Sequence, residues 1–213
     1  MDQRNRREEW WNSVTHGLGL VASVTATVLL IVFAALGGDP WLIVGVSVFG
    51  TTLVLLYAAS TLYHAVGSPR AKGWLRSLDH GAIFLLIAGT YTPFVLVPLR
   101  GGWGWSLFGV VWGFAVVGVV FKLLAAERFP RISTAVYIAL GWVVVVAIVP
   151  LVRRVPAATL GWLLAGGLSY TAGTIFYGCH RVPYGHAIWH LFVLGGSACH
   201  AIAVATLLGT TVR

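Results

Sequence analysis

The 213 residues are 58% hydrophobic and only 9% charged, with a mean hydropathy of +0.87. Such a composition excludes an ordinary soluble domain and indicates a protein that folds in lipid. The formal net charge of +8 favours membrane lipids with anionic headgroups as partners, and nothing in the sequence resembles a nucleic-acid-binding surface.

Seven apolar segments, taken in chain order, predict seven transmembrane helices. A bilayer crossing needs about 20 residues, and the segments cover 18–36, 41–64, 79–99, 103–124, 134–152, 157–178 and 185–208. Little of the chain is left over, so we expect no soluble domain and no cleaved leader. The expected fold class is an all-α membrane protein, a seven-transmembrane helix bundle in which residues 1–213 form one domain.

The basic residues between these segments predict the orientation. Ten fall on the side of the N-terminus and four on the other side, and Lys and Arg are enriched on the cytoplasmic side of membrane proteins. We therefore expect a cytoplasmic N-terminus and a C-terminus outside. The ten are Arg4, Arg6, Arg7, Arg70, Lys72, Arg76, Lys122, Arg128, Arg131 and Arg181, and the four are Arg100, Arg153, Arg154 and Arg213.

Five polar residues stand out because polar groups in hydrocarbon are costly and tend to be functional. His186 and His190 in the last helix are four residues apart, so they share one face. Ser60 and His64 repeat this spacing at the end of the second helix, and Asp79 begins the third. Because consecutive helices alternate in direction, all five are expected at the cytoplasmic side.

This convergence predicts a metal site. Three neutral imidazoles, from His64, His186 and His190, match the ligand set of a catalytic zinc site, in which water takes the fourth position. Asp79 is suited to hold or deprotonate that water, and Ser60 to orient the substrate or a developing oxyanion. The expected cofactor is therefore Zn²⁺, with Asp79 and Ser60 as catalytic residues.

Each residue also has a purely structural interpretation, which the sequence leaves open. A membrane histidine can simply hydrogen-bond to a neighbouring helix. Asp79 can pair with Arg76 or Lys72 at the interface. Ser60 can bond to a carbonyl of its own helix.

Other polar residues are expected to play lesser roles. Glu9, Asn12 and His16 line one face at a helix start, where capping and headgroup contacts suffice, with closure of the site as the alternative. His200 follows His190 by ten residues, about 15 Å along a helix, and is expected to be a packing residue.

The remaining polar and small residues have simple expected positions. His80 and His180 are expected at the membrane interface. Gly109 and Gly113 form a small-x-x-x-small pair that predicts close helix packing inside the bundle, with dimerisation as the alternative.

Several other classes of membrane protein are disfavoured. A retinal protein needs a lysine within a helix, but Lys72 and Lys122 both fall at cytoplasmic ends. Haem binding through His186 and His200 lacks a facing histidine in the outer half. The cytoplasmic N-terminus disfavours a G-protein-coupled receptor, and the absence of visible repeats disfavours a transporter.

Four motifs occur in order and together resemble the hemolysin III family of bacterial membrane proteins, relatives of the adiponectin and progestin receptors and more distantly of alkaline ceramidases. They are Glu9-x-x-Asn12-x-x-Thr15-His16-Gly17, Ser60-x-x-x-His64, Asp79 with Gly81 and Thr92-Pro93, and His186-x-x-x-His190. The resemblance covers the whole chain. It implies the bacterial plasma membrane and a zinc ion held by His64, His186 and His190, with Asp79 hydrogen-bonded to zinc-bound water.

Two functions follow from this reading. The first is a zinc-dependent hydrolase of lipid amide bonds, as in ceramides, which the similarity to ceramidases implies. The alternative is a non-enzymatic regulator of membrane lipid state or energetics with a structural zinc site. Three histidines beside a carboxylate leave room for water and favour the enzyme, but a shared metal site does not define the substrate.

The charge asymmetry generates a topology prediction. A reporter fused after Arg213 should behave as external, because the chain crosses the membrane seven times from a cytoplasmic start. Paired phosphatase and fluorescent-protein fusions measure this directly, with fusions after Arg70 as the cytoplasmic control. A cytoplasmic signal from the C-terminal fusion would contradict the predicted orientation.

Overall fold

The structure is a computed structural model that describes residues 3–125, 130–179 and 181–209. It describes the side chains of these residues except residues 3–5, 125, 130 and 131. Arg128, His180 and Arg213, which enter the expectations above, lie outside the described residues. The described chain is helical throughout and contains no strand. It confirms the all-helical fold class.

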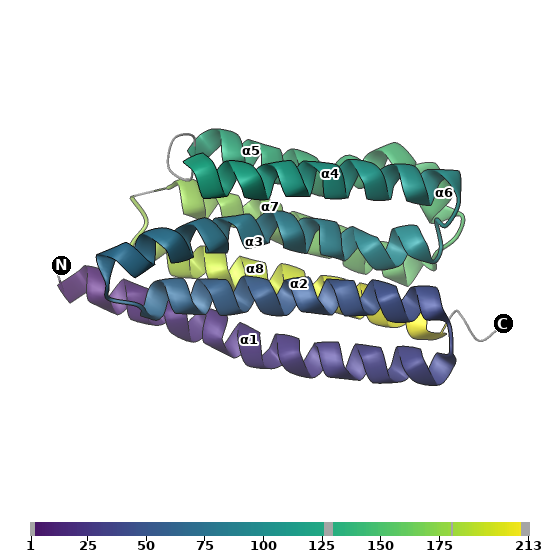
Figure 1. Cartoon of the computed structure of the whole chain (residues 1–213), viewed down its shortest axis with the longest axis horizontal. Coiled ribbons are helices and arrows are strands. Elements are labelled where there is room, and N and C mark those ends of the chain that lie inside the picture. The colour runs from purple at the N-terminus through teal and green to yellow at the C-terminus, as the bar shows by residue number, and fades with distance from the viewer. Residues whose placement is uncertain (1–2, 126–129, 180, 210–213) are drawn as a thin grey trace.

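Seven helical segments follow one another up and down the bundle (Figure 1). Six are long and apolar enough to cross a membrane, and the seventh, α7, has 22 residues and packs along α8. The elements are α1 (Gln3–Gly37), α2 (Pro40–Ala65), α3 (Pro69–Leu96), α4 (Gly102–Ala125), α5 (Pro130–Gly141) with the 3₁₀ helix η1 (Val143–Ala147) and α6 (Ile148–Val152), α7 (Ala157–Gly178), and α8 (Gly185–Ala205) with the 3₁₀ helix η2 (Thr206–Gly209).

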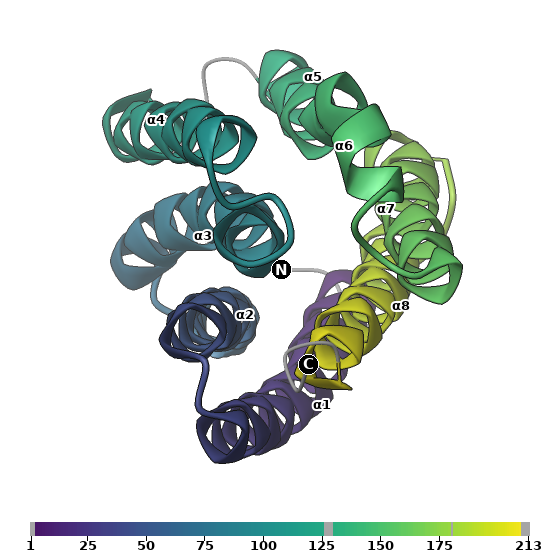
Figure 2. The ribbon, with the colours of Figure 1, turned by 90° about the vertical axis from the view of Figure 1, so that its right-hand side faces the viewer.

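Viewed from one end, the segments form a ring in sequence order, and α8 closes it against α1 (Figure 2). The alternating directions bring the starts of α1, α3 and α8 and the end of α2 to the same end of the bundle (Figure 1). We call this end, where the N-terminus lies, the N-side.

Two helices begin well before the apolar segments that predicted them. α1 starts at Gln3 and α3 at Pro69, whereas hydropathy placed their starts at residues 18 and 79. Charged residues are compatible with helix, so the backbone continues past the apolar stretch. Glu9, Asn12 and His16 therefore lie within α1, and Asp79 lies well inside α3.

The fifth segment is broken where a single helix was expected over 134–152. The backbone leaves the α-helix after Gly141 and continues as η1. The Tyr91 hydroxyl of α3 donates to the carbonyls of Leu140 and Gly141, at 3.1 and 2.8 Å, and accepts from the Val144 N–H at 2.9 Å. This side chain satisfies backbone groups that hydrocarbon cannot.

Glycine permits a very close approach of α2 and α3. A Cβ on Gly45 would lie 2.8 Å from the Pro93 Cα, which is backbone and cannot turn aside. Gly109 and Gly113 behave differently, because a Cβ on either would meet nothing within 4 Å among the described residues. The expectation that this pair packs inside the bundle is wrong; both residues are exposed on the surface of α4.

These glycines give a matched stability test. Gly45→Ala should lower the free energy of unfolding by about 1–3 kcal/mol, because overpacking forces α2 and α3 apart. Gly113→Ala, with open space around it, should leave stability unchanged or slightly raised. Thermal unfolding of both purified variants measures the difference, and equal melting temperatures would contradict the close packing.

Candidate metal centre

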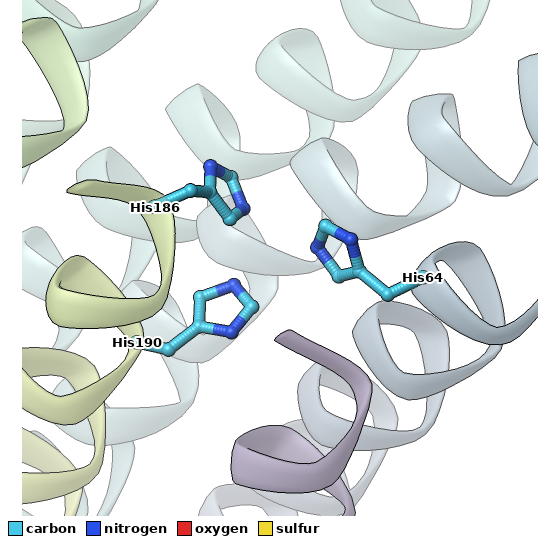
Figure 3. Close-up of side chains that lie close together, drawn as sticks. All are labelled: His64, His186 and His190. Carbon is cyan, nitrogen blue, oxygen red and sulfur yellow. The ribbon is translucent and has the colours of Figure 1, made fainter. Parts of the chain in front are cut away.

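Three histidines from two helices meet at the N-side of the bundle. His64 comes from the last turn of α2, and His186 and His190 come from the first turns of α8 (Figure 3). One ring nitrogen from each lies within 4.8 Å of one from the others. His64 and His190 are buried and His186 is partly buried. The expected convergence of these three side chains is therefore present.

The Nδ1 atoms of two of these rings are hydrogen-bonded by α1. His64 Nδ1 lies 3.0 Å from the Glu9 Oε2, and His190 Nδ1 lies 3.2 Å from the Asn12 backbone carbonyl. His190 Nδ1 also lies 3.2 Å from the Thr15 hydroxyl, which itself donates to the carbonyls of Trp11 and Asn12. A carboxylate and a carbonyl can only accept, so each Nδ1 carries the proton. Each Nε2 is consequently a lone-pair acceptor.

All three Nε2 atoms are buried and have no hydrogen-bond partner among the described residues. A buried polar atom without a partner costs about 1–3 kcal/mol, and three such ring nitrogens in one place need an explanation. A cation shared by three imidazole lone pairs supplies it, with second-shell acceptors on the opposite nitrogens as metal-bound histidines usually have. The residues present therefore fit a metal ion.

The N-terminal part of α1 lies against this cluster and adds further contacts. Lys72 Nζ donates to the Glu9 Oε2 at 2.7 Å, which holds the carboxylate that faces His64. The His16 ring stacks on His190 with centroids 3.5 Å apart and planes 14° apart. The sequence left two interpretations for Glu9, Asn12 and His16, namely capping with headgroup contacts and closure of the site; the structure places them against the histidines, as the second interpretation expects.

Asp79 and Ser60 lie together beside the cluster. Both are buried, at 3% and 0% exposure. The Ser60 hydroxyl is near enough to the Asp79 carboxyl to interact with it, although the contact falls short of hydrogen-bond geometry. Arg76 acts on the same carboxyl electrostatically, and His64 lies near it. Lys72 instead pairs with Glu9, so one structural alternative for Asp79, pairing with Lys72, is not what the structure shows.

A cavity of about 170 Å³ extends from this region into the bundle, lined by residues from α1, α2, α3, α4, α5, α7 and α8. Asp79 and His16 are part of its wall next to the histidine cluster. Its wall is mostly apolar, with Ile83, Leu86 and Ile87 from α3 among the lining residues. The site therefore adjoins a chamber suited to a hydrophobic ligand.

Two other histidines also line this cavity. His80, expected at the membrane interface, is part of the wall, and its backbone carbonyl accepts from the Tyr137 hydroxyl at 2.8 Å. His200 packs on Tyr170 and lies 3.2 Å from the Leu163 carbonyl through Nε2, so its expected packing role is confirmed, although it also faces the cavity.

The fold and the site define a multi-pass integral membrane protein with a buried three-histidine cluster at one end of a helical bundle. The chain belongs to the Haemolysin-III related family, whose model matches residues 4–201. Membership confirms the resemblance seen in the motifs, and with the apolar helices it places the protein in the bacterial cell membrane.

Individual relatives cover most of the chain. It is 47% identical to the Hemolysin-3 homolog of Bacillus subtilis over 90% of both chains. It is 45% identical to Hemolysin-3 of Bacillus cereus over 90% of this chain and 88% of that protein. It is 28% identical to the rice Heptahelical transmembrane protein ADIPOR2 over 75% of this chain and 79% of that one. The similarity to adiponectin receptors is thus more distant.

The contact between Glu9 and His64 can be tested through metal affinity. Glu9→Gln should weaken zinc binding by about 10–100-fold, because an uncharged amide oxygen polarises His64 less than the carboxylate does and no longer pairs with the charge of Lys72. Competition with a chromogenic chelator measures the affinity.

Two further variants serve as controls for this measurement. Glu8→Gln, one residue away and about 100° around the helix, should bind zinc like the wild type. His186→Ala/His190→Ala should lose the metal altogether. Full zinc occupancy in this double variant would rule out the assigned site.

Proposed function

We propose that this protein is a zinc-dependent hydrolase that cleaves amide bonds of membrane lipids, ceramide-like in the position of the amide. The observation that carries the proposal is the set of three buried, unpartnered Nε2 atoms next to a buried carboxylate and an apolar cavity. A metal ligand set, a proton acceptor and a hydrophobic chamber are the parts that such a reaction needs.

His64, His186 and His190 hold the metal in this proposal. Zinc bound there supplies Lewis acidity for a carbonyl oxygen and increases the acidity of a water molecule. Glu9 and the Asn12 carbonyl keep the Nδ1 protons of His64 and His190 in place, so both rings present Nε2 to the ion. Three protein ligands, as distinct from four, are typical of catalytic zinc.

Asp79 and Ser60 do the remaining chemistry. The Asp79 carboxylate accepts a proton from the attacking water as the water oxygen bonds to the amide carbon, and passes a proton to the nitrogen as the C–N bond breaks. The Ser60 Oγ, which has no hydrogen-bond partner of good geometry, donates to the carbonyl oxygen as negative charge develops there. The products are a fatty acid and an amine.

A structural zinc site in a non-enzymatic regulator is the second candidate. The observation that favours it is the position of the histidines, which join α2 to α8, two helices that otherwise have little direct backbone contact. A zinc ion bound to these histidines would cross-link the two helices. This candidate requires the metal but not the Asp79 carboxylate, whereas the hydrolase requires both.

The two candidates are separated by Asp79→Asn. In the hydrolase this variant should keep most of its zinc, because the three imidazoles remain, but lose about two to four orders of magnitude in rate with the proton acceptor. His64→Ala should lose zinc and activity together. The assay is fatty-acid release from short-chain ceramides and other lipid amides, with metal content measured on the same samples.

The contrary outcome is equally clear. Zinc-loaded wild type that hydrolyses nothing across the panel, with Asp79→Asn still complementing a deletion strain, would remove the hydrolase and leave the structural-zinc regulator.

A further inference from the structure

A second hollow lies at the end of the bundle opposite the histidine cluster, where α2 and α4 begin (Figure 1). It is a groove of about 350 Å³ between α2 and α4, which we call the α2–α4 groove. Its lining residues run from Trp41 to Val48 on α2 and from Trp105 to Trp112 on α4. Seven residues of helix rise about 10 Å, so the groove lies within one leaflet, whose hydrocarbon is about 15 Å thick.

The floor of this groove is α3, which lies between the two walls (Figure 2). The backbone of α3 is close to both. Gly45 of α2 sits against Pro93, and a Cβ on Gly104 of α4 would overlap the Val95 carbonyl oxygen. Because these contacts involve backbone atoms, the groove is a fixed feature of helix packing.

The inner part of the groove offers no free hydrogen-bonding group among its lining residues. The Trp112 Nε1 donates to the Thr92 Oγ1 at 3.1 Å, and the Thr92 hydroxyl donates to the Ala88 carbonyl at 2.8 Å. The remaining side chains of this part are hydrocarbon or phenyl, from Val44, Val48, Leu96 and Phe108. Such a lining suits a hydrocarbon chain.

A cation lies at the mouth of the groove. The Arg100 Cζ is 5.4 Å from the ring centroid of Trp41, within the range of a cation–π contact. Trp41 also meets Trp105 edge to face, with centroids 5.8 Å apart. Arg100 is exposed and forms no ion pair with any described residue. The two indole rings therefore keep a guanidinium available where headgroups meet hydrocarbon.

The surroundings of Arg100 favour an anion. Arg153 and Arg154 are exposed at the same end, and Arg154 donates to the Pro98 carbonyl at 3.0 Å, which brings their loop to that of Arg100. Asp39 is the only acidic residue of the described chain at this end, and its Oδ1 accepts from the first N–H groups of α2. Residues 210–213, Thr-Thr-Val-Arg, add no acidic side chain.

We infer that the α2–α4 groove binds an anionic phospholipid, with its phosphate on Arg100 and one acyl chain along the groove. A guanidinium matches the oxygens of a phosphate, and the chain covers the aromatic and aliphatic walls. The site goes beyond the proposed function and does not depend on it, because the groove and the histidine cluster lie at opposite ends of the bundle. A headgroup without a cation, as in phosphatidylglycerol, fits the arginines better than the choline of phosphatidylcholine.

The test is lipid binding to the full-length protein in a non-ionic detergent, followed by native mass spectrometry. The probes are dioleoyl phosphatidylglycerol and dioleoyl phosphatidylcholine, which share their chains and differ in net charge. The wild type should bind one phosphatidylglycerol about fivefold more tightly, the scale of one basic residue at the headgroup level. Equal affinities for the two lipids would overturn the inference.

Charge variants assign the preference to Arg100. Arg100→Gln should abolish it, and Arg100→Lys should keep most of it. Arg153→Gln removes the same charge from an exposed position at the same end and should leave the preference intact. If Arg153→Gln reduces the preference as much as Arg100→Gln, the attraction comes from the general charge of this end, and the assigned seat is wrong.

A second pair of variants tests the chain. Val48→Phe fills the groove and should weaken binding of both lipids several-fold while the headgroup preference remains. Val110→Phe, on the exposed surface of α4 outside the groove, should bind both lipids like the wild type. Melting temperatures are measured on the same samples, and Val44→Phe, at a more exposed position of the groove, replaces Val48→Phe if that variant is destabilised. Unchanged lipid binding by the stable groove variant would contradict the assigned groove.

Inorganic phosphate distinguishes a lipid headgroup from a free anion. Millimolar phosphate should fail to displace phosphatidylglycerol, because it gains nothing from the groove. Arg100-dependent binding of phosphate with the affinity of the lipid would show a site for a free anion and overturn the lipid part.

Discussion

Hydrocarbon offers no hydrogen bonds, and this constraint explains most of what is unusual in the bundle. Backbone groups are satisfied within helices, and where the fifth segment breaks, the Tyr91 hydroxyl takes over the exposed groups. Side chains follow the same rule, since Glu9 and the Asn12 carbonyl satisfy the outer nitrogens of His64 and His190. The three Nε2 atoms are among the buried polar atoms that have no partner within the described residues, and they are the ones that converge on one point.

Helix direction alone was enough to predict which residues would meet. Apolar segments alternate in direction across a membrane, so Ser60, His64, Asp79, His186 and His190 had to lie at the same end of the bundle. Spacing of four residues then placed both histidines of α8 on one face. The structure brings all five together, although their chemical roles stay predictions.

The parts that sequence reasoning missed depend on helix ends and helix rotation. Hydropathy marks where a chain meets lipid, not where its helix begins, and so the sequence placed Glu9 and His16 at a helix start without deciding whether they reach the site. Their spacing of three or four residues, shared with Asn12, put them on one face but did not show what that face contacts. The sequence does not indicate which face of α4 points into the bundle, because nearly every face of this helix is apolar. For that reason neither the inward position of Lys122 nor the outward position of Gly113 could be read from the pattern.

The histidine cluster joins the beginning of the chain to its end. Glu9 and Asn12 leave the ribosome first, and His186 and His190 leave it nearly last. Five helical segments are therefore synthesised between α1, which contacts His190, and α8, which carries it. A chain that stops before α8 has no pair of histidines and no closed ring. The histidine cluster therefore cannot assemble before α8 has been inserted, and its geometry exists only in a molecule whose synthesis and insertion are complete.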